Sequence, residues 1–235
     1  MGSKNRIAKH ILPIMLEYRK EGQWWVEPFV GGANMIGKVD GVRIGGDTNV
    51  YLIELFRAIQ LGWEPPNSCT EEEYNQIRKH KDLFPMNLVG FVGIGCSYSG
   101  KWFGGYARGK DNKGKERNYC LESKKNIMAQ KDKIQTVDFR HGSYLSLPMP
   151  KKCIIYCDPP YEKSTKYKDK FNHVKFWQWC RDMAKEGHTV FISEYNAPDD
   201  FECIWSKEIV SSLTKNTGGK TGVEKLFKIK EVKSE

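Results

Sequence analysis

The chain has 235 residues, a length that suits one domain of ordinary size carrying an insert. Hydrophobic residues make up 39% of it, enough for a buried core, but no apolar run approaches membrane length, which argues against a membrane protein. The net charge of +9 favours a polyanionic partner, and a basic surface without such a partner would give the same charge.

Hydrophobic periodicity predicts helices alternating with strands along the chain. The first helix is expected over residues 5–19, with a kink at Pro13, and others over 49–61, 71–80, 120–133 and 171–185. The last of these should bury Val174, Trp177 and Met183. Strands are expected from Trp24, and within 42–47, 134–147, 153–157 and 189–193, followed by a hairpin of 209–213 and 226–232. This alternation predicts an α/β fold with a mainly parallel sheet.

Residues 90–118 differ from the rest of the chain in composition. Eight glycines lie between Gly90 and Gly114, interleaved with aromatic residues, and the stretch 101–117 has a local net charge of +4. Such a segment is expected to bury little surface and to be mobile until it meets a partner. Basic groups between aromatic rings suit phosphates and splayed bases, and an ordinary flexible loop is the alternative.

Asp158-Pro159-Pro160-Tyr161 is the most informative motif, and it directly follows the apolar run 153–157. Because proline lacks a ladder donor and fixes φ, the strand must end there in a stiff turn. In open α/β sheets the carboxyl ends of strands are where ligands bind.

The chemistry that suits this turn is methyl transfer to an exocyclic amine. The lone pair of an adenine amino group is delocalised into the ring, so a catalyst must localise it and stabilise the developing positive charge. Asp158 and the carbonyl of Pro159 can accept the two amino hydrogens, and the carboxylate can stabilise the cation. Tyr161 offers a flat face on which a base can stack. An ordinary strand-to-loop turn is the alternative.

A second motif points to a nucleotide-like cofactor. The segment from Trp24 to Asn34 is predicted to be a strand, an acid and then a glycine turn at Gly31-Gly32, where the backbone can approach a ligand closely. Asp47 ends the next short strand, sixteen residues after Gly31, near the spacing at which an acid meets ribose hydroxyls in nucleotide-binding folds. The three features occur in the order glycine turn, ribose acid and Asp-Pro-Pro-Tyr.

With these motifs the chain resembles the Dam-type DNA adenine-N6 methyltransferases of the alpha group, in particular phage and prophage members. Residues 27–32 are similar to the cofactor loop of that family and residues 158–161 to its catalytic tetrapeptide. Gly2-Ser3-Lys4 resembles the end of an N-terminal cofactor motif, and residues 191–196 and 221–227 resemble later strands. The family usually has a further glycine where Ala33-Asn34 stands, and Gly142-Ser143-Tyr144 occupies the place of an acid near the cofactor adenine.

The resemblance implies a Rossmann-like S-adenosylmethionine-dependent methyltransferase fold with a small DNA-recognition insert. Residues 1–63 and 134–235 would form the catalytic domain, and residues 64–133 the target-recognition insert. The implied catalytic residues are Asp158, Pro159, Pro160 and Tyr161. The implied residues for S-adenosyl-L-methionine are Lys4, Glu27, Pro28, Phe29, Gly31, Gly32, Asp47, Ser143, Tyr144 and Asp158. The implied DNA contacts are Ser97, Tyr98, Lys101, Trp102, Arg108, Lys110, Lys113 and Lys115.

The implied activity is site-specific methylation of adenine N6 in duplex DNA, for which the target base must be flipped out of the stack. Alternatives are a methyltransferase of the same fold acting on RNA adenine, cytosine N4 or a protein glutamine, and a catalytically inactive DNA-binding relative. Asp158 favours adenine, because enzymes for the other amines more often begin the tetrapeptide with Ser or Asn. The implied partner is double-stranded DNA, with a cognate restriction endonuclease left open.

Cysteine usage and the N-terminal sequence bear on the compartment. Seven cysteines without a Cys-x-x-Cys pair, and histidines without metal-ligand spacing, predict reduced thiols and no metal site. The start is basic and interrupted by charge, so no signal peptide is expected. We therefore expect a protein of the cytoplasm of a bacterial or phage-infected cell.

Overall fold

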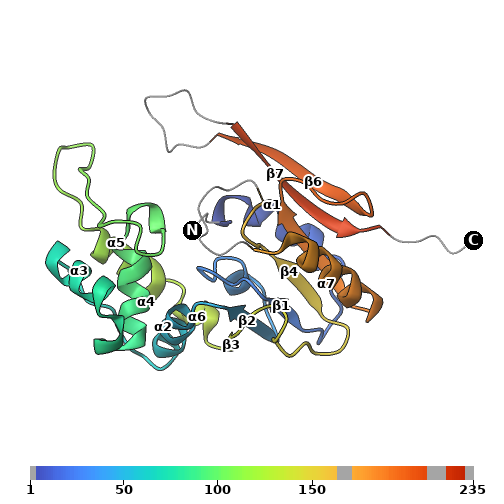
Figure 1. The fold of residues 1–235 in the computed structure, drawn as a ribbon, viewed down its shortest axis with the longest axis horizontal. Coiled ribbons are helices and arrows are strands. Elements are labelled where there is room, and N and C mark those ends of the chain that lie inside the picture. The colour runs from blue at the N-terminus through green and yellow to red at the C-terminus, as the bar shows by residue number, and fades with distance from the viewer. Residues whose placement is uncertain (1–3, 163–170, 211–220, 231–235) are drawn as a thin grey trace, which may run out of the picture. The chain divides into compact units, whose positions relative to one another are not determined.

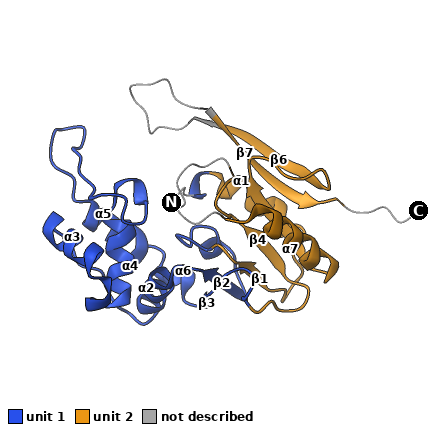
Figure 2. Ribbon diagram, in the orientation of Figure 1, with its two compact units in different colours: residues 1–6, 30–147 blue, residues 7–29, 148–235 orange. Residues whose placement is uncertain are grey.

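The computed structural model describes residues 4–162, 171–210 and 221–230 (Figure 1). Its contacts divide the chain into two compact units, which Figure 2 shows in different colours. Unit 1 consists of residues 1–6 and 30–147, and unit 2 of residues 7–29 and 148–235. Within the described residues no helix is both long and apolar enough to cross a membrane.

The sheet has the predicted α/β architecture. Among the described residues seven strands follow the order β3-β2-β1-β4-β5-β7-β6. The pairs β2/β3, β1/β4 and β4/β5 are parallel, and β7 runs antiparallel to both β5 and β6. The order 3-2-1-4-5 is that of a doubly wound Rossmann-like sheet, in which the strand order reverses between β1 and β4. The predicted fold class is therefore confirmed, including the antiparallel strand near the C-terminal end.

Unit 1 contains two strands and most of the helices. The strands are β2 (Arg43–Asp47) and β3 (Val137–His141). The α-helices are α2 (Val50–Gln60), α3 (Glu71–Lys79), α4 (Met86–Gly95), α5 (Tyr119–Met128) and α6 (Lys131–Ile134). Short 3-10 turns cover Ile36–Lys38, Lys81–Leu83 and Tyr98–Gly100.

Polar residues fix the beginnings of these helices as their sequences suggest. At the start of α3 the Thr70 hydroxyl accepts from the N–H of Glu73, and the Glu73 carboxylate accepts from the N–H of Thr70 at 2.7 Å. This reciprocal capping box satisfies two N–H groups that the helix cannot bond internally. Asn49 caps α2 and Asn118 caps α5, because the side-chain oxygen of each accepts one backbone N–H of its helix.

Unit 2 contains the other five strands and two helices. The helices are α1 (Asn5–Leu16), which begins in unit 1, and α7 (His173–Lys185). The strands are β1 (Trp25–Glu27), β4 (Ile154–Cys157), β5 (Thr189–Glu194), β6 (Phe201–Val210) and β7 (Thr221–Ile229). Trp25 is fully buried and stacks on Tyr156 of β4, so its expected role in the core is confirmed.

Two expectations about unit 2 need correction. Val174 is 82% exposed, because α7 buries Phe176, Trp177, Trp179 and Cys180 instead. The hairpin begins at Phe201 rather than 209, and the expected strand residues 211–213, 231 and 232 lie outside the described residues.

His188, just before β5, is buried, and its Nδ1 accepts the backbone N–H of Cys153 at 3.1 Å. Burial lowers the pKa of His188.

The expectation that residues 90–118 bury little surface was wrong for their first part. Helix α4 buries Val89, Gly90, Phe91, Val92 and Gly93. A Cβ atom on Gly90 would lie 2.1 Å from the carbonyl oxygen of Tyr51, so the absence of a side chain lets α4 pack directly on the backbone of α2. Gly90 and Gly93 of α4 are therefore close-packing residues, since an added Cβ on Gly93 would lie 2.5 Å from the Trp102 ring.

We predict that Gly90→Ala destabilises the protein. The overlap with the Tyr51 carbonyl forces two helices apart, and overpacking of this kind costs about 1–3 kcal/mol. This outweighs the roughly 1 kcal/mol that alanine gains in helix propensity. Urea unfolding measures the difference. Gly37→Ala is the control, since its added Cβ meets Ile134 at an ordinary 3.6 Å. Equal midpoints for both variants would contradict the close approach of α4 to α2.

Candidate active site

In unit 1 the glycine turn is tied to the end of β2 by the carboxylate of Asp47. One oxygen of Asp47 accepts the N–H of Gly31 at 3.1 Å, and the other accepts the N–H of Asn49 at 2.8 Å. A backbone bond from Val30 to the Gly46 carbonyl, 2.8 Å long, holds the same two segments together. The two positions that the sequence paired, sixteen residues apart, are thus in direct contact.

Asp47 suits a ligand with hydroxyl groups. Its side chain is only half-buried, and each carboxylate oxygen can accept a second hydrogen bond beside the backbone N–H it already holds. Burial raises the pKa of Asp47, while the N–H groups of Asn49 and Gly31 act in the opposite direction. A vicinal diol offers neutral donors that the carboxylate can accept without a further charge.

The backbone of the turn shows that Ala33 adopts a conformation that usually requires glycine. Gly31 has φ +48° and Ala33 has φ +53°, both in the left-handed region. For alanine this conformation costs roughly 1–2 kcal/mol. The Ala33 methyl group is buried, and burying one carbon is worth about 0.8 kcal/mol, so packing offsets a large part of the strain. The loop therefore keeps the left-handed contour without the additional glycine.

The other predicted cofactor residues of unit 1 differ in their burial and in their contacts with this turn. Gly142 donates its N–H to the Asp47 carbonyl at 3.0 Å, which brings the half-exposed Ser143 to the end of β2. The ring of Tyr144 is buried, so its side chain serves packing. Lys4 precedes Asn5, whose Oδ1 accepts from Lys38 while the same ammonium group bonds the Asn34 carbonyl of the turn. Gly2 and Ser3 lie outside the described residues.

In unit 2 three adjacent parallel strands each end in an acidic residue at the same edge of the sheet. Glu27 ends β1, Asp158 follows the last residue of β4, and Glu194 ends β5. Glu27 is 3% exposed and accepts from the Trp25 indole N–H at 2.8 Å. Because β1 and β4 flank the reversal of strand order, this edge is where an open α/β sheet binds ligands. Asp158 is half-buried there.

Glu194 holds the loop that follows the tetrapeptide Asp158–Tyr161. Its carboxylate, 2% exposed, accepts the backbone N–H of Glu162 at 2.7 Å and that of Tyr195. Burial raises the pKa of Glu194, and these two N–H groups oppose the shift. The end of β5 therefore fixes the position of the chain just after Tyr161.

Tyr161 is held by its hydroxyl as well as by its ring. The hydroxyl donates to Glu224 of β7 at 3.0 Å, and the ring meets Tyr195 edge to face with centroids 4.6 Å apart. Burial raises the pKa of Tyr161, and the charges of Asp158 and Glu224 raise it further, which keeps the phenol protonated as a donor. The sequence pointed only to the face of this ring and gave no sign of its anchor.

Phe29 and Pro28 have packing roles. Phe29 meets Phe176 of α7 and Phe171 edge to face, with centroids 5.7 and 5.8 Å apart. Pro28 is buried. These contacts fix the chain between Glu27 and the glycine turn, so both residues shape the loop from within the core.

The candidate DNA-contacting residues of unit 1 divide into exposed and buried groups. Ser97 is 4% exposed, and its hydroxyl bonds Tyr74 and the Gly93 carbonyl, so this hydroxyl is already engaged within the protein. The DNA contact expected of Ser97 stays a prediction. Trp102 is half-buried and stacks on Tyr51. The exposed residues are Tyr98, Lys101, Arg108, Lys110, Lys113 and Lys115.

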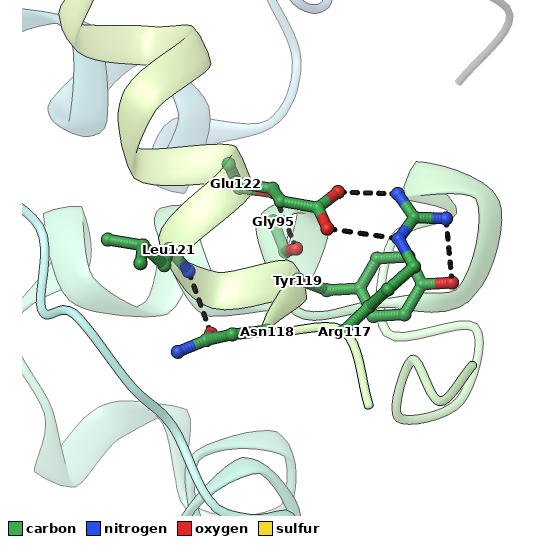
Figure 3. A network of polar contacts seen from close by, with 7 residues as sticks. Gly95, Arg117, Asn118, Tyr119, Leu121 and Glu122 are labelled. Atoms are coloured by element: carbon green, nitrogen blue, oxygen red, sulfur yellow. Dashed lines mark hydrogen bonds and ion pairs between the residues drawn. The ribbon is translucent and has the colours of Figure 1, made fainter. Parts of the chain in front are cut away.

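The basic segment before α5 is ordered by local hydrogen bonds. Asp111 accepts the N–H groups of Lys113 and Lys115, which turns the chain back on itself. Figure 3 shows the guanidinium of Arg117 facing the Glu122 carboxylate, with the Tyr119 hydroxyl beside it. The charge of Arg117 is thus committed within the protein, and Arg108 likewise pairs with Glu71. The three lysines between them carry the exposed charge of the segment.

Sequence reasoning missed three residues of the unit 2 site: Glu194, Tyr195 and Glu224. The first two follow an expected strand, so their place at its carboxyl end was a usable signal. Glu224 comes from β7, 63 positions after Tyr161, and nothing in the local sequence indicates that the two side chains meet.

Comparisons with known proteins show fold likeness only. No profile of a known protein family matches the chain, and no curated protein matches it in sequence. Among solved structures, a provisionally assigned methylase from Haemophilus influenzae is 10% identical, with a TM-score of 0.38, and the match covers 97% of this chain and 99% of that one.

Two further structures are similar at the same low level. A provisionally assigned class I S-adenosylmethionine-dependent methyltransferase from Listeria monocytogenes has 11% identity and a TM-score of 0.40, with coverage of 100% of this chain and 62% of that one. A provisionally assigned methyltransferase in complex with SAH has 11% identity and a TM-score of 0.38, with coverage of 99% and 54%. The chain thus spans roughly half to three fifths of these two proteins. Likeness at this level says nothing about activity.

We predict a measurable coupling between Tyr161 and Glu224 in the free energy of unfolding. A hydrogen bond to a carboxylate contributes about 1.5–3 kcal/mol when buried, and about 1 kcal/mol is expected here because both side chains are partly exposed. A double-mutant cycle with Tyr161→Phe and Glu224→Ala in urea unfolding gives this coupling. The control cycle combines Tyr161→Phe with Glu208→Ala, a change at an exposed acid of β6. The effects of these two changes on the free energy of unfolding should be additive. Additivity in both cycles would contradict the anchor.

Proposed function

We propose that this protein transfers a methyl group from S-adenosyl-L-methionine to N6 of an adenine that has been flipped out of duplex DNA. The observation that carries the proposal is the place of Asp158-Pro159-Pro160-Tyr161. The tetrapeptide leaves β4 at its carboxyl end, beside the reversal of strand order, with the carboxylate half-buried and the Tyr161 ring anchored by Glu224. A fixed acceptor and a fixed aromatic ring are what methylation of a planar amine requires.

The chemistry rests on the acceptors of this turn. Asp158 accepts one hydrogen of the amino group and the Pro159 carbonyl accepts the other, which directs the nitrogen lone pair away from the ring plane. As the nitrogen gains positive charge, the Asp158 carboxylate stabilises it without reorganisation. The cofactor, when bound, supplies an electrophilic methyl group. Tyr161 holds the base by stacking, which is worth about 1–3 kcal/mol.

The cofactor is proposed from the donor set of unit 1. Asp47 has acceptor capacity for ribose hydroxyls, and the left-handed turn at Gly31 exposes backbone near it. Ser143 follows Gly142, whose N–H bonds the backbone carbonyl of Asp47, and it offers a hydroxyl in that segment. Lys4 offers a cation for the carboxylate of the methionine part. Glu27, which belongs to unit 2, is proposed as a cofactor residue from the sequence resemblance alone.

DNA is proposed as the substrate because of the exposed basic and aromatic residues within 64–133, the proposed target-recognition insert. Lys110, Lys113 and Lys115 project from the turn organised by Asp111, and Tyr98 is 56% exposed. Lysines bind phosphates with release of counterions, and an exposed ring can stack on a base. We propose a cytoplasmic setting, in which such DNA is accessible.

Asp158→Ala is predicted to abolish methyl transfer, because the amino-hydrogen acceptor and the stabilising charge are lost together. DNA binding should persist, since phosphate contacts lie elsewhere. A tritiated methyl-transfer assay with duplex DNA measures this, and Asp199→Ala, an exposed acid of the same unit, is the control. Parallel assays with RNA and with DNA containing cytosine as the only exocyclic amine donor separate the alternative substrates. Turnover by Asp158→Ala at the wild-type rate would refute the mechanism.

Asp47→Ala is predicted to weaken S-adenosylmethionine binding by at least tenfold, because the hydroxyl acceptor and the tie to Gly31 disappear together. Asp47→Asn should lose less, since one carbonyl oxygen remains. Calorimetry gives both affinities. Asp132→Ala is the control, because Asp132 is an exposed acid on α6 of the same unit, and this variant should bind the cofactor like wild type. An unchanged affinity in Asp47→Ala would show that the ribose does not contact this residue.

A further inference from the structure

A hollow next to the glycine turn has a chemistry that the proposed active site does not use. It has a volume of about 370 Å³. We call it the Lys38 hollow, and its polar lining consists of Asn5, Asn34, Lys38, Asn126, Gln130 and Lys133. All of its lining residues belong to unit 1, and it contains two lysines and no acidic side chain.

The two lysines of the Lys38 hollow are in an electrostatically unfavourable arrangement. Burial lowers the pKa of Lys38, and the charge of Lys133 lowers it further. Lys38 uses its ammonium group to bond Asn5 and the Asn34 carbonyl, both neutral acceptors. Within the described residues the ammonium group of Lys133 has no hydrogen-bond or ion-pair partner. An anion between the two lysines would remove the repulsion and offset the desolvation of Lys38.

A second, independent feature points to a missing ligand at the same place. In the part of the chain that the structure describes, the side-chain oxygen of Gln130 is the buried polar atom without a hydrogen-bond partner. Such an atom destabilises the fold unless something bonds to it. Gln130 lines the Lys38 hollow, and turning its amide by half a rotation presents the NH2 group instead. With Asn126 it then offers neutral donors beside the two ammonium groups.

We propose that the Lys38 hollow binds a phosphate group, with Lys38 and Lys133 as its charged ligands and the amides of Asn126 and Gln130 as further donors. The phosphate can be part of the DNA backbone or a free anion, and the two sources have the same recognition chemistry. The first source rests on the proposed function, whereas the site itself does not. Because Lys38 also bonds the Asn34 carbonyl, an occupied hollow would stiffen the end of the glycine turn.

The first experiment uses inorganic phosphate as the probe and needs no activity. The melting temperature of the full chain is measured while phosphate replaces chloride at constant ionic strength. Wild type should gain stability with phosphate concentration according to mass action, and Lys133→Gln should lose most of this gain. Lys131→Gln, on the same short helix but outside the lining of the hollow, is the matched control and should respond like wild type. An equal response of wild type and Lys133→Gln would overturn the proposal.

The second experiment identifies the source of the phosphate. If the hollow holds a DNA phosphate, Lys133→Gln should reduce the slope of log affinity against log salt by about 0.9, while Lys131→Gln leaves it unchanged. An unchanged slope with an intact phosphate response in the first experiment assigns the site to a free anion. A wild-type protein that binds no DNA at all would refute the proposed function, but the phosphate response would still test the hollow.

Discussion

The hydrogen bonds of Asp47 are the constraint on which the candidate cofactor half of the site depends. One carboxylate accepts the N–H of Gly31 in the turn and the N–H of Asn49 at the start of α2. It therefore links the end of β2 to the segments on both sides of it in sequence. The left-handed residues Gly31 and Ala33 would be costly in an unsupported loop, and these bonds keep the turn in place.

The acidic edge of unit 2 is stable because its buried carboxylates accept hydrogen bonds from nearby donors. Glu27 accepts from the Trp25 indole, and Glu194 accepts two backbone N–H groups. A buried carboxylate without such donors would lose several kcal/mol or take up a proton. Each bond also fixes a residue near the turn at Asp158. The hydrogen bonds that stabilise the buried carboxylates of Glu27 and Glu194 therefore also order the residues around Asp158.

The sequence predicted features that depend on local patterns. The mainly parallel sheet, the turn at Asp158 and the place of Asp47 at the end of a strand follow from apolar runs, prolines and a spacing typical of nucleotide-binding folds. Features that depend on tertiary contacts were not predictable. The glycine-rich composition of α4 suggested a mobile segment. Gly90 instead allows close contact with the backbone of Tyr51, and no local sequence pattern indicates such a contact.

The same limit applies to the site. Glu224 reaches Tyr161 across 63 positions, and the burial of Ser97 depends on Tyr74 of another helix. The face that α7 buries is set by the neighbours it meets, so Val174 was misplaced while Trp177 was not. Sequence reasoning proposed which residues carry chemistry, and the structure showed the hydrogen bonds and ring contacts that hold some of them, such as Asp47 and Tyr161.

The acidic edge of unit 2 restricts what can lie beside Asp158. Acidic residues lie at the ends of β1, β4 and β5, and such an edge repels phosphates but accepts an amino group, whose hydrogens are donors. Under the proposed function a neutral base is therefore the favourable ligand beside Asp158, and charged phosphates are not. Within unit 1 the lysines of the Lys38 hollow have the opposite preference, because their ammonium groups attract an anion.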